Sequence, residues 1–312
     1  MQIINSLAPV FTVIALGAIL RKSNFLSANF IDGMIRLTYW VGLPCLLFYK
    51  IASATSAGAR TGQIFLVLVV GMISSLILAY AFGRLLRMPG ESIGTFIQAS
   101  FRGNLAFIGL PVILYGLSGK AGSEMQDLNA AAVLVLAAMV PIYNLLSVVV
   151  LLVGRKRLDW PAFKKMLLQI VTNPLLIACL IGILFLKLAW GLPEALWRSS
   201  MAIGQMSLPL ALLSIGGTLA NVELRGRWHL PLVASLIKVG AAPTAGYFAA
   251  GLLGLASGEA RIALIYLACP TAAASFVLAD QLGGDRTLAA SAVLLSTLLA
   301  MASLGIAIAI RF

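Results

Sequence analysis

Two stretches decide the fold, Ser100-Phe-Arg-Gly-Asn-Leu-Ala-Phe-Ile-Gly-Leu-Pro111 and Ala268-Cys-Pro-Thr-Ala-Ala-Ala-Ser275. Each one interrupts an apolar segment with residues that weaken a helix. Gly103 weakens the first helix, and Asn104 is a good N-cap for a helix that restarts after it. Pro270 removes a backbone hydrogen bond from the second, and Thr271 is suited to cap the helix that restarts there. In a segment that crosses a membrane, such backbone is tolerated only where it lines a cavity or is buried in protein.

The composition places these stretches in a membrane protein. Of 312 residues, 61% are hydrophobic and 10% are charged. A soluble domain has about 45–50% apolar residues and about 25% charged residues. This excludes an ordinary cytosolic enzyme, a disordered chain and a secreted disulfide scaffold. The three cysteines show no CxxC spacing and the single histidine is His229, so neither a zinc site nor a histidine-based catalytic centre is expected.

We expect ten membrane spans. Eight segments without Asp, Glu, Lys or Arg cover residues 3–20, 63–83, 128–154, 166–186, 199–222, 239–258, 262–279 and 287–310. Two more, 33–52 and 92–118, are apolar but contain charges. No basic region precedes the first span, so no signal peptide is expected.

Connections with many and with few basic residues alternate along the chain, and this difference predicts the orientation of the protein in the membrane. One side holds twelve of them, namely Arg21, Lys22, Arg84, Arg87, Arg155, Lys156, Arg157, Lys164, Lys165, Arg225, Arg227 and Arg286. The other side holds five, which are Arg60, Lys120, Arg198, Arg261 and Arg311. The positive-inside rule then places the twelve in the cytoplasm and both termini on the opposite side. We expect the bacterial inner membrane, where that side is the periplasm. The net charge of +12 reflects orientation and attraction to anionic lipid, so no nucleic-acid partner is expected.

The two halves of the chain resemble each other. We expect a first five-helix repeat over 1–153, a basic cytoplasmic linker over 154–165 and a second repeat over 166–312. Leu43-Pro44 in the second span corresponds to Leu208-Pro209 in the seventh. Because five is odd, the second repeat enters the membrane from the opposite side, which is typical of secondary transporters.

The interior charges favour an anionic ligand. Each restarted half-helix carries about +0.5 charge at its N-terminus, and Arg102 and Lys238 add positive charge. The role of each cation is open. Arg102 pairs with Asp280 as a buried strut or meets substrate. Lys238 belongs to a structural pair, replaces a bound cation or contacts substrate. Tyr143 and Asn144 either line the cavity or bond between helices.

At these residues the chain resembles the auxin efflux carrier family, which includes plant carriers and bacterial organic-acid permeases. The most specific segments are Asn104-Leu-Ala-Phe-Ile-Gly-Leu-Pro111 and Cys269-Pro-Thr-Ala-Ala-Ala-Ser-Phe-Val-Leu-Ala279. The resemblance implies an all-α fold similar to bile-acid symporters, with two inverted five-helix repeats and broken crossover helices four and nine. It also implies a scaffold from helices 1, 2, 6 and 7 that mediates dimerisation. Helices 3–5 and 8–10 would form a moving transport domain.

We therefore predict a secondary transporter for small organic anions, either auxin-like or mono- and dicarboxylates such as malate or malonate. It would work by alternating access of the elevator type. The alternative is a sodium- or proton-coupled symporter or antiporter of the bile-acid-symporter type. The expected substrate-binding residues are Arg102, Gly103, Asn104, Tyr143, Asn144, Cys269, Pro270, Thr271 and Ser275. Structural or coupling roles are expected for Lys238, Asp280, Pro44 and Pro209.

The expected partners are the organic anion, the lipid bilayer and a second copy of the chain. No cofactor or metal is expected, and the residues do not indicate a bound sodium ion, although carbonyl groups, Asn and Ser are able to hold one. An intramembrane enzyme is disfavoured because His229 lies between spans and no pair of membrane Asp residues is present.

Overall fold

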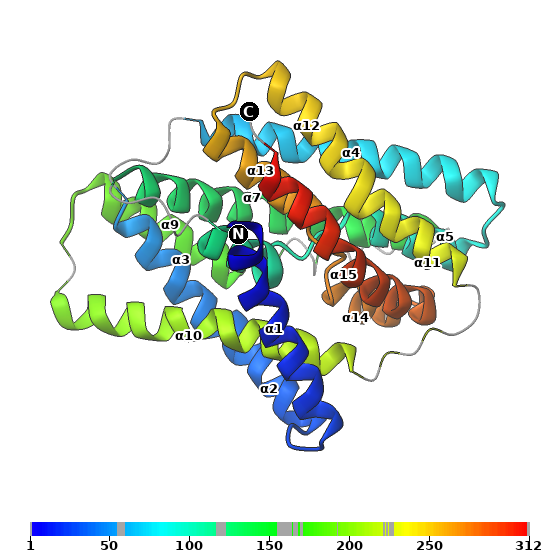
Figure 1. Ribbon diagram of the computed structural model, residues 1–312, viewed down its shortest axis with the longest axis horizontal. Coiled ribbons are helices and arrows are strands. Elements are labelled where there is room, and N and C mark those ends of the chain that lie inside the picture. Colours follow the sequence, from blue (N-terminus) through cyan, green and yellow to red (C-terminus); the bar gives the residue numbers. More distant parts are fainter. Residues whose placement is uncertain are drawn as a thin grey trace. The chain divides into compact units, whose positions relative to one another are not determined.

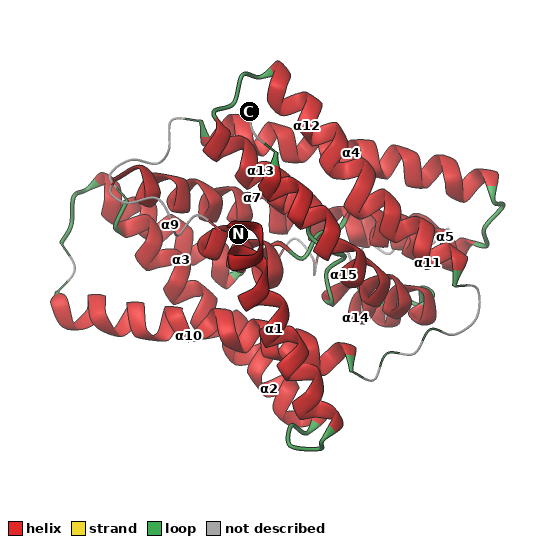
Figure 2. Cartoon of the chain, viewed as in Figure 1, coloured by secondary structure: helices red, strands yellow, loops and turns green. Residues whose placement is uncertain are grey.

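The computed structural model describes residues 2–54, 60–116, 123–154, 164, 168, 171–191, 193–220, 222, 224 and 228–310. Within these ranges the chain is helical and contains no strand (Figure 2). Most of the basic linker 154–165 lies outside them, as do Lys120, Arg225, Arg227 and Arg311. The chain divides into two compact units, each made of several segments of sequence.

Unit 1 comprises Met1–Gly62, Ala106–Ala138 and Gln169–Asn221. Its helices are α1 (Gln2–Lys22), α2 (Ala28–Leu37), the π-helix η1 (Thr38–Gly42), α3 (Leu43–Ala52), α6 (Leu110–Gly116), α9 (Pro174–Lys187), α10 (Glu194–Leu219) and the first part of α7 (Ser123–Gly154). The helix α10 packs along α1, α2 and α3 (Figure 1).

Glycines bring the helices of unit 1 close together. A Cβ added at Gly216 in α10 would overlap the carbonyl oxygen of Ile14, and one added at Gly17 in α1 would overlap the carbonyl oxygen of Leu213. Small residues at such positions let membrane helices approach backbone to backbone. The α1–α10 contact therefore depends on Gly17 and Gly216.

Unit 2 comprises Gln63–Leu105, Met139–Leu168 and Val222–Phe312. Its helices are most of α4 (Thr61–Leu85), α5 (Gly90–Phe101), the last part of α7, α11 (His229–Leu236), the π-helix η3 (Ile237–Ala241), α12 (Ala242–Leu252), α13 (Ser257–Ala268), α14 (Ala274–Gln281) and α15 (Arg286–Ala309). A third π-helix, η2 (Leu105–Gly109), begins at the end of one unit 2 segment.

Proline explains two of the π-helices. Pro44 follows η1 and Pro243 follows η3 at the start of the next α-helix. Since a proline ring clashes with the carbonyl four residues earlier, a widened turn relieves the clash. The amide of Ala242 accordingly donates to the carbonyl of Ile237, five residues back.

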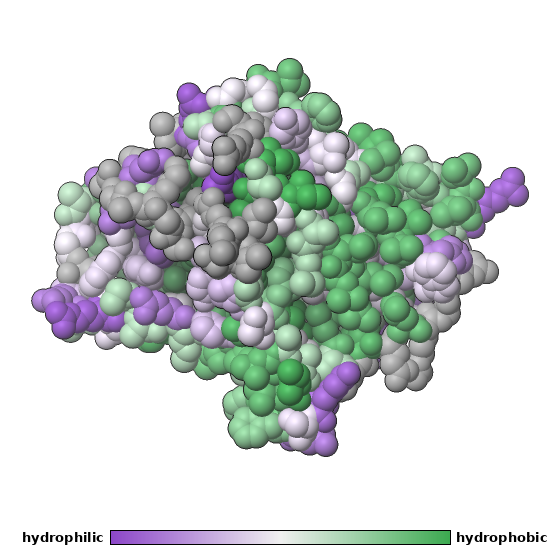
Figure 3. All heavy atoms as spheres, in the orientation of Figure 1, coloured by the Kyte–Doolittle hydropathy of each residue, from purple (hydrophilic) through white to green (hydrophobic). Residues whose placement is uncertain are grey.

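Six helical segments in the described part are long and apolar enough to cross a membrane, namely Ala28–Ala52, Thr61–Leu85, Glu124–Gly154, Glu194–Leu219, His229–Leu252 and Arg286–Ala309. Large apolar side chains are exposed along one face of α4, at Leu66, Val70, Ile73 and Ile77, and the visible face has broad apolar areas (Figure 3). The all-helical, multi-pass character is confirmed, while the ten-span inverted repeat and the division into scaffold and transport domain stay predictions.

The predicted fourth and ninth spans are both interrupted. The helix α5 ends at Phe101 and the chain resumes as η2 at Leu105. The helix α13 ends at Ala268 and α14 begins at Ala274. These two breaks position the candidate site.

Candidate functional site

The two interruptions contact each other through their backbones within unit 2. Gly103 and Thr271 form an isolated antiparallel bridge. Next to it, the Asn104 amide donates to the carbonyl oxygen of Pro270 at 2.8 Å. All four of these residues are buried. The structure thus brings together the two stretches that the sequence singled out.

Several backbone amides at this junction are already hydrogen-bonded within the protein. Besides Asn104, the Ala272 amide donates to the Arg102 carbonyl at 2.9 Å, and the Thr271 amide donates to the Ser296 hydroxyl at 3.0 Å. The sequence predicted free amides facing an anion, and for these three groups that prediction is wrong. The reason is that the two breaks satisfy each other's hydrogen bonds. Positive charge for a ligand must therefore come from side chains.

Thr271 also acts differently from the expectation. Its hydroxyl donates to the Ala99 carbonyl at 2.7 Å, which ties the second interruption to α5. The N-cap of α14 is Ala273, without a side-chain capping bond. The predicted capping role of Thr271 is therefore wrong.

Arg102 supplies one buried cation. It follows the last residue of α5 with extended backbone, and its side chain is 8% exposed. Its Nη2 donates to Oδ1 of Asn144 in α7 at 2.6 Å, and the rings of Phe101 and Tyr143 stand 6.0 Å apart beside this bond. Tyr143 and Asn144, which were expected either to line the cavity or to bond between helices, therefore both lie where α5 meets α7.

Asp280 forms its described ion pair with a residue other than Arg102. Its carboxylate pairs with Arg286 at 3.5 Å, and both side chains are at least half exposed. The described contacts of Arg102 and Asp280 are with different residues. They do not include the buried ion pair that was considered between the two. The cause is the position of Asp280 near the end of α14, at the surface.

Lys238 supplies the second buried cation. It lies in η3 and is fully buried, and its Nζ donates to the carbonyl oxygen of Leu267 at 2.5 Å. Leu267 lies in the last turn of α13, where helix carbonyls carry partial negative charge. A Cβ added at Gly103 would stand 3.4 Å from the Lys238 Nζ, so the ammonium lies against the junction.

The charged side chains that are buried in the described part of the chain are both cations. Arg102 and Lys238 are the charged side chains in the buried set, which contains no Asp or Glu. Burying a charge is expensive, and in a membrane segment a buried charge marks a functional site. The junction of the two interrupted helices is therefore an electropositive interior.

The remaining predicted residues divide between the units. Cys269 is buried beside the junction and its thiol donates to the Ile265 carbonyl at 3.1 Å, while the buried hydroxyl of Ser275 has no hydrogen-bond partner in the described structure. Pro44 and Pro209 lie in α3 and α10 of unit 1. In the described part of the chain, no cluster of three or more His, Cys, Asp or Glu side chains is placed to hold a metal ion.

Two polar residues that the sequence analysis did not select also lie here. Gln98 in α5 and Ser147 in α7 are fully buried, and the side-chain nitrogen and oxygen of Gln98 and the hydroxyl of Ser147 lack hydrogen-bond partners in the described structure. The available signal was an amide side chain one helical turn before Arg102 in an apolar segment.

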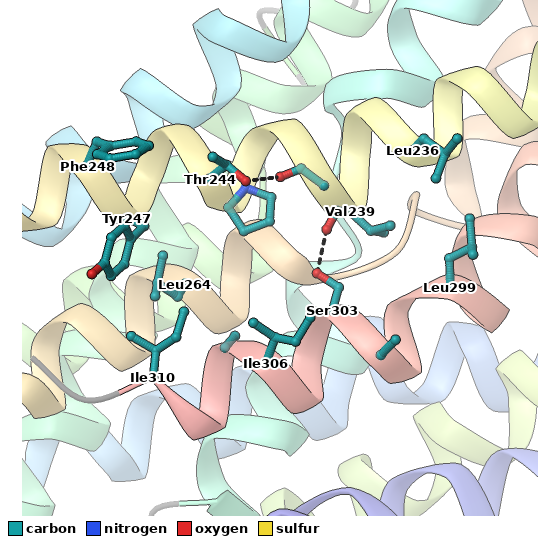
Figure 4. A pocket seen from close by; sticks show the side chains of 14 residues that line it. Leu236, Val239, Thr244, Tyr247, Phe248, Leu264, Leu299, Ser303, Ile306 and Ile310 are labelled. Carbon is teal, nitrogen blue, oxygen red and sulfur yellow. Dashed lines mark hydrogen bonds between the residues drawn. The ribbon is translucent and has the colours of Figure 1, made fainter.

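A separate hollow of unit 2 is apolar. It is an open hollow of about 450 Å³ beside η3, α12, α13 and α15, and Leu264, Leu299 and Ile306 line it (Figure 4). Two of its hydroxyl groups are turned to the backbone: Thr244 donates to the Gly240 carbonyl at 2.8 Å and Ser303 to the Val239 carbonyl at 2.5 Å. We call this hollow the apolar groove; it offers little to a polar solute.

A multi-pass helical chain with interrupted helices meeting around buried cations has the features of a membrane transporter. Residues 2–308 match the model of the membrane transport protein family, and the chain belongs to that family. This confirms the resemblance to the auxin efflux carriers. A similar protein is an uncharacterized transporter of Methanocaldococcus jannaschii, 23% identical over 270 residues, with 84% of this chain and 83% of that protein covered.

Proposed function

We propose that this transporter carries small organic anions and binds their carboxylate at the junction of the two interrupted helices. The observation that carries the proposal is the burial of two cations, Arg102 and Lys238, at this junction. A carboxylate that enters this interior supplies a counter-charge. The substrate class then covers auxin-like acids and mono- or dicarboxylates such as malate and malonate.

The geometry favours Arg102 as the direct contact. Its guanidinium bonds Asn144 through Nη2, and a planar guanidinium offers several donors suited to a carboxylate. Lys238 donates a hydrogen bond to the Leu267 carbonyl and contributes its charge at the junction. Asn104 and Thr271 place the backbone of the two breaks around the same point.

For the transport step we propose an elevator in which the predicted spans 3–5 and 8–10 carry the site and the predicted spans 1, 2, 6 and 7 form the scaffold. The assignment draws on the location of the junction residues in the interruptions of the predicted spans 4 and 9. The ten-span inverted repeat, the inner-membrane location, the periplasmic termini and a homodimer belong to the same proposal.

Ion coupling is the second candidate. Exchange of protons on carboxylates requires acidic groups at the site, and the described interior holds none. Coupling to sodium through carbonyl and hydroxyl oxygens is decided by replacing sodium with a larger organic cation during uptake. Uptake that is unchanged by the replacement supports a carrier without sodium coupling.

The direct test is uptake of labelled malate, malonate and indole-acetate into proteoliposomes that contain the purified protein. We expect saturable uptake of at least one carboxylate, and weaker binding in Asn104→Ala with an unchanged elution profile. Transport of organic cations together with exclusion of all three acids would defeat the proposal.

A further inference from the structure

The interface between α5 and α7 contains polar groups that the carboxylate site does not use. Gln98 and Ser147 are both fully buried. The amide nitrogen and oxygen of Gln98 and the hydroxyl of Ser147 have no hydrogen-bond partner in the described structure. Native proteins leave few buried polar groups unpaired, so three such atoms in one interface require a reason.

The packing of α5 against α7 fixes which residues face each other. At one end, a Cβ added at Gly94 would stand 2.7 Å from the carbonyl oxygen of Val150. At the other end, Arg102 bonds Asn144 at 2.6 Å. From the first contact to the second, the residue numbers rise along α5 and fall along α7. The two helices are therefore antiparallel at this interface.

Gln98 and Ser147 fall at the same level of this antiparallel pair. Gln98 lies four residues from each of the two contact residues of α5, and Ser147 lies three residues from each of those of α7. Residues three or four apart share a helix face. Both therefore belong to the contacting faces, one turn from the Arg102–Asn144 bond, which is about 6 Å along the axis.

The chemistry of the pair selects an uncharged group. The amide of Gln98 both donates and accepts, and the hydroxyl of Ser147 does the same. A ligand hydroxyl matches both functions at once, whereas a methyl group would leave the three atoms unpaired. We propose that Gln98 and Ser147 form a subsite for the hydroxyl of a short hydroxycarboxylate whose carboxylate is held at Arg102. This inference rests on the proposed function.

The test compares acids that differ by one hydroxyl group. Uptake of 3-hydroxybutyrate against butyrate, and of malate against succinate, is measured in proteoliposomes for the wild type, Gln98→Met and Ser147→Ala. We expect the wild type to favour the hydroxylated acid of each pair. Each variant should lower the uptake of the hydroxylated acid about tenfold, since one buried hydrogen-bonding group is lost. The uptake of the unhydroxylated acid should stay unchanged.

A matched control separates the subsite from general packing. Ser100 lies in the same helix and is fully buried, but its hydroxyl donates to the Phe96 carbonyl at 2.8 Å, so Ser100→Ala should keep the wild-type preference. Gln98→Met removes unpaired groups at nearly constant volume, and its melting temperature should equal or exceed that of the wild type. Ser147→Ala provides the same test if the first variant does not fold.

The outcomes separate this inference from the proposed function. Wild-type protein that moves carboxylates without a hydroxyl preference, or variants that keep the preference, would overturn the subsite and leave the pair as a place for bound water only. Wild-type protein that moves no carboxylate would instead overturn the proposed function itself.

Discussion

The apolar groove and the junction of the interrupted helices lie in the same unit and share the segment η3, yet they are opposites. The groove is an open hollow of about 450 Å³ in which the hydroxyl groups of Thr244 and Ser303 are turned to the backbone. The junction is buried and holds Arg102 and Lys238. In lipid, an apolar hollow needs no occupant other than acyl chains, whereas buried charge needs a counter-charge. We therefore expect charge, and not volume, to mark the substrate site.

The largest effect is expected from Arg102→Gln. Loss of a buried hydrogen-bonded charge costs at least about 2 kcal/mol of binding, which is about thirtyfold in affinity. Titration of a transported carboxylate into the purified variant measures it. Arg286→Gln is the control, because Arg286 is exposed and pairs with Asp280 at 3.5 Å; equal losses in both variants would refute a special role for Arg102.

Lys238→Met comes next. The substitution keeps the length and apolar stem of the side chain but removes the ammonium that bonds the Leu267 carbonyl, so carboxylate uptake should fall about tenfold. Lys187→Met in α9, where the lysine is exposed, should leave uptake unchanged. Wild-type rates in Lys238→Met would show that its charge serves neither substrate nor junction.

A smaller effect is expected from Gly103→Ala. The added Cβ would stand 3.2 Å from Cε of Lys238, so the lysine must shift by a few tenths of an ångström and uptake should fall about threefold. Gly240→Ala in η3 meets nothing within 4 Å and serves as the matched control. A greater loss in Gly240→Ala than in Gly103→Ala would contradict the described junction.

The smallest effect is expected in the apolar groove. Phe248 is 64% exposed and lines the groove (Figure 4), so Phe248→Leu should change uptake by less than about twofold. Initial rates at saturating substrate provide the measurement. A change in substrate selectivity caused by this substitution would move the site from the junction to the groove.

The sequence predicted the interruptions because their causes are local. Gly103 and Pro270 weaken a helix wherever the rest of the chain lies. Their mutual hydrogen bonding depends on contact between residues far apart in the chain, so the free amides expected at Asn104 and Thr271 are in fact paired.

Side-chain partners were harder to predict than backbone breaks. Arg102 was considered with Asp280 on the basis of charge alone, whereas its described contact is Asn144. The placement of Gln98 and Ser147 at one level depends on the antiparallel register of α5 and α7, which spacing in the sequence does not give. Helix rotation and register are properties of tertiary packing, and they decide which polar groups meet.

The most direct test of the central claim compares opposite charges in the same vesicles. Proteoliposomes are loaded with purified protein, and uptake of labelled malate is measured beside uptake of labelled putrescine, a diamine of similar length. Buried Arg102 and Lys238 predict saturable uptake of malate and none of putrescine. Saturable uptake of putrescine with exclusion of malate would contradict an electropositive site.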